Sequence, residues 1–126
     1  MQLEGSCHCG KVRYSAKSNT PYPFSRCYCS TCRKLNGGGG YTVNIMAEAP
    51  TMKIEGAEHL SVYRSALNDR GAYEEDGLGF SRRSFCKHCG TMMWNANAKY
   101  PDWIYLFASS VDTLLPAPPE VRHTMV

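Results

Sequence analysis

Short segments in which hydrophobic and polar residues alternate dominate this chain of 126 residues. Alternation with a period of two is typical of a β-strand that buries one face. A continuous apolar run near the C-terminus, WIYLFA, is typical of a strand buried on both faces. We therefore expect strands at residues 11–15, 41–45, 52–55, 60–64, 84–85, 91–94 and 103–108.

Helical periodicity is weak along the whole chain, because no long window repeats its apolar residues every 3.6 positions. One short helix is expected to begin near Cys32 and to end at Gly37. Residues 66–79 are polar and spaced by glycines, which predicts a loop. The pattern predicts a mainly β protein of short strands, with a single domain at residues 1–126 and no internal linker.

Composition and charge narrow the class of protein. The chain is 43% hydrophobic and 20% charged, as in an ordinary globular protein. It has no apolar run near the ~18 residues that a membrane span requires. Its first residues, MQLEGSCHCG, lack the regions of a secretory signal, so we expect a reducing cytoplasm. The net charge of +3 falls short of a basic stripe, so we do not expect a nucleic-acid partner.

Cysteine spacing is the most informative chemical feature. An odd number cannot all pair as disulfides in one chain, and thiols this close in sequence would form strained rings. Such spacing is typical of metal ligands. The seven cysteines fall into three groups, Cys7 with Cys9, Cys27 with Cys29 and Cys32, and Cys86 with Cys89.

The two outer groups resemble knuckles of a zinc site. Cys86 and Cys89 belong to a CxxCG motif, in which Gly90 can take the positive φ of a tight turn. Cys7 and Cys9 belong to a shorter CxCG motif. One pair cannot complete a tetrahedral site, but two pairs give a closed four-thiolate site of the structural kind.

The central group then stands alone with three ligands. Three protein ligands and one vacant position are the pattern of a catalytic zinc, so we expect Cys27, Cys29 and Cys32 to be catalytic. Two alternatives stay open at this point. Cys29 and Cys32 could form a redox motif, or a histidine could complete a purely structural site. The histidines that could do so are His8, His59, His88 and His123.

Three sequence segments together resemble one known family. GSCHCGKVRYSA, RCYCSTCRKLNG and SFCKHCGTMMW, in this order and spacing, look like segments of the glutathione-dependent formaldehyde-activating enzymes, a family that includes centromere protein V. The resemblance runs from about Gly5 to about Pro119. It implies coiled, mostly antiparallel β-sheets stapled by zinc. It also implies a structural zinc on the outer cysteine pairs and a catalytic zinc on the central three.

The resemblance also implies a function. The family is classed with carbon–sulfur lyases, and its founding activity joins formaldehyde to the thiol of glutathione. We therefore expect a zinc-dependent enzyme with two Zn²⁺ per chain. It would add or remove a small aldehyde at the thiol of glutathione or a related thiol. The alternative is a non-catalytic, zinc-stapled binding module for nucleic acid or protein.

Basic and aromatic residues near the cysteines are candidates for substrate binding. Glutathione carries two carboxylates, and arginine binds carboxylates through two parallel hydrogen bonds. Arg33 is our candidate for holding this anionic thiol, with Arg82 or Arg83 as further candidates. Tyr28 lies between two of the central cysteines, so its hydroxyl could donate a hydrogen bond in the pocket.

Overall fold

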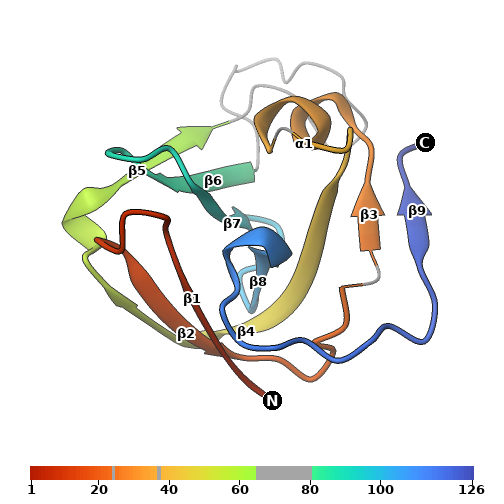
Figure 1. Cartoon of the computed structure of the whole chain (residues 1–126), viewed down its shortest axis with the longest axis horizontal. Helices are drawn as coiled ribbons and strands as arrows, with labels where there is room; N and C mark the ends of the chain where they lie inside the picture. Colours follow the sequence, from red (N-terminus) through yellow and green to blue (C-terminus); the bar gives the residue numbers. More distant parts are fainter. Residues whose placement is uncertain (24, 37, 65–80) are drawn as a thin grey trace.

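A computed structural model describes residues 1–23, 25–36, 38–64 and 81–126, and it confirms the mainly β class (Figure 1). The predicted loop at residues 66–79 lies outside the described residues. The strands are β1 (Gln2–Ser6), β2 (Arg13–Lys17), β3 (Ser25–Cys27), β4 (Thr42–Glu55), β5 (Leu60–Arg64), β6 (Ser81–Cys86), β7 (Met92–Asn97), β8 (Trp103–Phe107) and β9 (Arg122–Thr124). The helical segments are α1 (Ser30–Leu35) and the 3-10 turns η1 (Ala57–His59) and η2 (Ala108–Ser110). No helix in the described ranges is long and apolar enough to cross a membrane.

The strands form one coiled sheet in the order β1-β2-β4-β8-β7-β6-β5. Strand β4 curves through the molecule and has different neighbours along its length (Figure 1). Its first part pairs with β3 and β8, and its second part pairs with β2. Neighbouring strands are antiparallel except for β9, which runs parallel to β3.

The length of β4 corrects the prediction of two strands at 41–45 and 52–55. One strand of 14 residues runs through both segments and through Pro50. Proline has no N–H to donate, so it is tolerated in a sheet only at an edge or an irregularity. Here the register of β2 against β4 shifts at this point, because Lys17 pairs with Glu48 while Ser15 pairs with Lys53. The bulge accommodates the proline without ending the strand.

Two element boundaries also differ from the prediction. Helix α1 begins at Ser30 rather than near Cys32, because Cys29 caps it: the Cys29 Sγ accepts a hydrogen bond from the Cys32 N–H at 3.3 Å. Strand β2 begins at Arg13 rather than at residue 11, because the preceding residues form a tight turn. Strands β1, β3 and β9 were not predicted, since two of them have only three residues.

The coiled sheet encloses an apolar core with one buried polar network. The rings of Tyr14 and Trp94 meet edge to face at 5.3 Å. The Tyr14 hydroxyl lies 2.7 Å from the Ser110 Oγ, which in turn lies 2.9 Å from the carbonyl oxygens of Met93 and Phe107. Burial raises the pKa of Tyr14 to about 12, so its hydroxyl stays protonated as a donor. The core includes Leu3, Val12, Ala16, Ile45, Ala47, Met93, Trp94, Ile104 and Leu106.

Removing the Tyr14 hydroxyl is expected to lower stability modestly. Tyr14→Phe removes the hydrogen bond to Ser110 but leaves the ring packed on Trp94, so the free energy of unfolding should fall by about 1 kcal/mol. Urea denaturation followed by tryptophan fluorescence measures the change. Tyr63→Phe is the matched control, because Tyr63 is 47% exposed. Equal shifts in the two variants would contradict a role for the buried network.

Candidate metal centres and the adjoining cavity

Two hairpin turns bring the outer cysteines together. One turn joins β1 to β2 and the other joins β6 to β7. In each, a glycine N–H donates to the carbonyl of the first cysteine, from Gly10 to Cys7 at 3.0 Å and from Gly90 to Cys86 at 2.8 Å. Both glycines have a φ of 78°, which confirms the positive φ predicted at Gly90. The two turns therefore resemble each other, although the turn at Cys86 is one residue longer.

The four sulfurs are spaced as ligands of one tetrahedral ion. All of them lie within 4.8 Å of one another. The Sγ of Cys9 is 3.5 Å from that of Cys7 and 3.7 Å from that of Cys86. Four sulfurs bound at about 2.3 Å around one zinc lie about 3.8 Å apart, so the cluster fits this ion. A hydrogen bond with the Thr91 hydroxyl lowers the pKa of Cys89 to about 5, which favours a thiolate there.

The three central cysteines form a second cluster beside α1. Cys27 ends β3, Cys29 caps α1, and Cys32 lies in the first turn of the helix. Their sulfurs also lie within 4.8 Å of one another. A hydrogen bond from Cys32 lowers the pKa of Cys27 to about 7. The same pairing and burial raise the pKa of Cys32, although nearby Arg83 opposes this rise. The thiolate therefore forms more readily on Cys27 than on Cys32.

No histidine among the described residues joins the three-cysteine cluster. The Nδ1 of His123 lies 2.7 Å from the Tyr28 hydroxyl. The Nδ1 of His59 lies 2.9 Å from the Nε2 of His88, beside the other cluster. His8 is exposed. Among the residues that the structure describes, the cluster therefore has three protein ligands and an open side.

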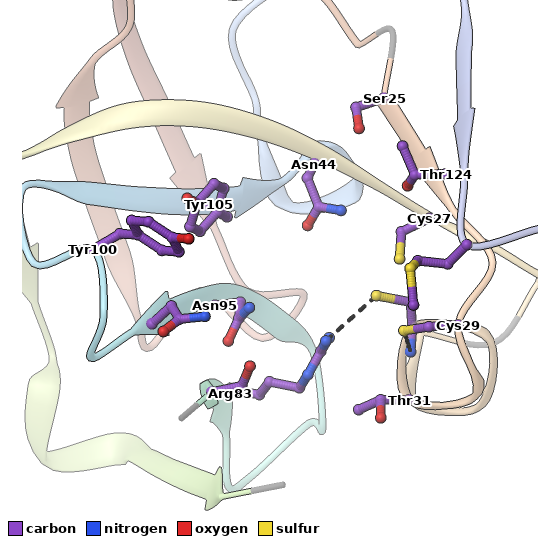
Figure 2. A pocket seen from close by; sticks show the side chains of 14 residues that line it. Ser25, Cys27, Cys29, Thr31, Asn44, Arg83, Asn95, Tyr100, Tyr105 and Thr124 are labelled. Atoms are coloured by element: carbon purple, nitrogen blue, oxygen red, sulfur yellow. Dashed lines mark hydrogen bonds between the residues drawn. The ribbon is translucent and has the colours of Figure 1, made fainter. Parts of the chain in front are cut away.

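The open side faces a cavity of about 330 Å³ (Figure 2). The cysteines lie on one wall, and Tyr100, Tyr105 and Asn95 lie on the wall across from them. Asn44 points into the cavity from β4. Asn97 adds a third carboxamide to the lining. None of the four outer cysteines lines this cavity, so the two clusters differ in their access to it.

Arg83 is the arginine that the fold brings to the three-cysteine cluster. It is buried in β6, and its Nη2 donates a hydrogen bond to the Cys32 Sγ at 3.3 Å (Figure 2). Its guanidinium carbon lies 5.7 Å from the centre of the Phe107 ring. Arg33 and Arg82 are exposed and are not among the residues that line the cavity. The prediction that Arg33 holds the substrate stays a prediction.

Tyr28 also lies away from the cavity lining. Its ring packs against Tyr41 with centroids 5.4 Å apart, and its hydroxyl bonds to His123. It therefore links β3 to β9, because its backbone N–H also donates to the Thr124 carbonyl at 3.0 Å. The hydroxyl of Tyr28 thus forms a hydrogen bond with His123 of β9, and not with a residue that lines the cavity.

Sequence reasoning missed the far wall and the C-terminal part of the cavity. Strand β9 lies beside β3, and Thr124 and Met125 line the cavity next to the cysteines. A three-residue strand has too few positions for alternation to identify it. Nothing in the sequence marked Asn44, Asn95 and Asn97 as residues of a cavity either, since single asparagines are common in turns and at surfaces.

The described residues thus form a coiled, mainly antiparallel sheet with two cysteine clusters that could hold a metal ion, and one of these clusters lines a cavity. Residues 2–125 match the family described as glutathione-dependent formaldehyde-activating enzyme. The chain belongs to this family, which confirms the resemblance seen in the cysteine motifs and the prediction of an enzyme.

Individual relatives agree with this assignment. A Halomonas elongata protein, provisionally named a glutathione-dependent formaldehyde-activating enzyme, is 46% identical over the whole of this chain and 76% of its own length. An uncharacterised lyase of Schizosaccharomyces pombe is 31% identical over 82% of this chain and 65% of its own length. The crystal structure of a Rhodobacter sphaeroides protein shares the fold, with a TM-score of 0.69 and 22% identity over 96% of this chain and 99% of that one.

Proposed function

We propose that this protein is a zinc-dependent enzyme of the carbon–sulfur lyase type. It adds or removes a small aldehyde at the thiol of glutathione or of a related thiol. The observation that carries the proposal is the open cluster of Cys27, Cys29 and Cys32 at the wall of a cavity. The family match and the names of the relatives support the substrate class.

Two Zn²⁺ per chain fit the two clusters. The four outer cysteines suit a closed structural site, since their sulfurs have the spacing of a tetrahedral zinc. Cys27, Cys29 and Cys32 would hold the second ion at the cavity. There a zinc ion would lower the pKa of a bound thiol or polarise a carbonyl group. Such reduced thiols, and glutathione itself, are typical of a reducing cytoplasm, which we propose as the compartment.

The lining of the cavity suits a peptide that carries a thiol. A volume of about 330 Å³ lies at the small end of ligand-binding sites. The carboxamides of Asn44, Asn95 and Asn97 can each both donate and accept hydrogen bonds. The Asn95 Oδ1 is buried and has no partner among the described residues. Glutathione has peptide N–H groups that such an acceptor can bind, so this wall can hold its peptide backbone while the cysteine wall holds its reacting thiol.

Exchange NMR of glutathione with formaldehyde tests the proposal. The wild-type protein should raise the exchange rate above the uncatalysed rate, and Cys29→Ser should return it to that background. Serine is a good helix N-cap, so this substitution should preserve α1 while it removes one sulfur. Lys34→Gln, on the exposed side of the same helix, is the matched control and should match the wild type. Equal exchange rates for the wild type and Cys29→Ser would contradict the catalytic proposal.

A further inference from the structure

The guanidinium of Arg83 is buried with unused hydrogen-bonding capacity. The residue is 5% exposed. Its Nε and Nη1 atoms are buried and lack a hydrogen-bond partner among the residues that the structure describes. The ion pairs among the described residues do not involve Arg83, since they join Glu58 with His59 and Glu120 with Arg122. A buried cation that always carries its charge is unfavourable unless something pairs with it, and its free Nε and Nη1 can each donate to an oxygen acceptor.

The guanidinium that carries these free donors lies beside the cysteine wall of the cavity. Figure 2 shows Arg83 pointing from β6 toward the cysteine wall, where its Nη2 donates to the Cys32 Sγ at 3.3 Å. A guanidinium is small and planar, so Nε and Nη1 lie in one plane with Nη2 and are joined to it through a single carbon atom. Among the described residues that line the cavity, Arg83 is also the only one with a cationic or anionic side chain besides the thiols.

We propose that Arg83 is the oxyanion donor of this site. Its free N–H groups hydrogen-bond the aldehyde oxygen while that oxygen becomes an alkoxide. The inference rests on the proposed function. In the addition, the thiolate sulfur forms a bond to the carbonyl carbon, and the π electrons of the C=O bond move to the oxygen. The proton released by the thiol returns to that oxygen through water, so no oxidant or reductant is needed. Removal of the aldehyde is the reverse.

An alternative role for Arg83 is to anchor a carboxylate of the thiol. The geometry favours the oxyanion role, because the same guanidinium donates through Nη2 to the Cys32 Sγ at 3.3 Å. The carboxylates of glutathione lie far along the peptide from its thiol, whereas the new alkoxide lies on the carbon bonded to the reacting sulfur. A preorganised donor at a developing oxyanion is worth about 100-fold or more in kcat.

Binding of two stable glutathione analogues distinguishes these roles. Glutathione sulfonate places an oxyanion at the reacting end, whereas S-methylglutathione keeps both carboxylates but has no oxygen there. Calorimetric titration of the zinc-loaded protein should show that Arg83→Gln weakens sulfonate binding roughly 10- to 100-fold. Binding of S-methylglutathione should change by less than about twofold, because its contacts are elsewhere. Arg82→Gln, on the exposed neighbour, is the matched control for both ligands.

The kinetic expectation is a fall in the kcat of exchange of about 100-fold with little change in KM for glutathione. Equal weakening of both analogues would assign Arg83 to a carboxylate and overturn the proposal. Unchanged sulfonate binding would also overturn it. If Arg83→Gln loses zinc or its fold, Arg83→Lys is used, and selective weakening of sulfonate binding is again required. If the wild type binds neither analogue and does not accelerate exchange, the proposed function itself fails, and this inference fails with it.

Discussion

Replacing Cys86 by serine is expected to unfold the protein under conditions in which the wild type is folded. Cys86 is fully buried at the end of β6, and its cluster joins that hairpin to the β1–β2 hairpin at the other end of the sequence. The free energy of binding a structural zinc is about 10–16 kcal/mol, and it acts as folding free energy. That is as large as the whole stability of a typical domain, about 5–15 kcal/mol. Losing one of four thiolates should therefore remove most of the stability.

Thermal melting followed by near-ultraviolet circular dichroism measures this effect. Cys86→Ser should show no cooperative transition, with rapid digestion in limited proteolysis. Cys29→Ser is the matched control, because the three cysteines of the central cluster come from β3 and from the helix that directly follows it. This control should keep a melting midpoint close to that of the wild type. A normal midpoint in Cys86→Ser would contradict the structural role of the outer cluster.

Chelation is expected to release the two proposed zinc ions at very different rates. The three-cysteine cluster is open to the cavity, so a chelator can reach an ion there without unfolding the chain. The four-cysteine cluster has all four positions filled by the protein, and two of its sulfurs, those of Cys7 and Cys86, are buried. The zinc content should therefore fall from about two to about one per chain while the fold persists.

A metallochromic dye that reports released zinc, recorded together with circular dichroism, checks this expectation. Glutathione should slow the fast phase if it binds at the open cluster, and Cys29→Ser should lack the fast phase altogether. Release of both ions in one phase, or loss of the fold with the first ion, would count against one closed and one open site.

The sequence alone determined how the cysteines are divided. The turns at Gly10 and Gly90 are local structures, because a few consecutive residues fix which way the two sulfurs of each pair point. Two such pairs complete one tetrahedral site, and three cysteines remain. Alternation likewise predicted the strands that have one buried face, since a period of two is also a local property. The mainly β class followed from these local signals.

The choice among the arginines needed the tertiary structure. Counting back by twos from the buried Cys86 along β6 places Arg82, not Arg83, on the inner face. The structure instead exposes Arg82 and buries both Arg83 and Ser84, where the register of β6 against β7 shifts because Met93 of β7 is an extra residue. A bulge depends on pairing with β7, which the sequence of β6 alone does not reveal.

The cavity is the other feature that only the tertiary structure decided. Its walls come from segments far apart in the chain, with Cys27 on β3, Asn44 on β4, Asn95 on β7 and Thr124 on β9. Spacing along the chain predicts contacts only between residues close in sequence, and these contacts arise when the sheet coils. The sequence thus determined which chemistry is present, because cysteine spacing is local. Long-range strand pairing decided what the open cluster faces.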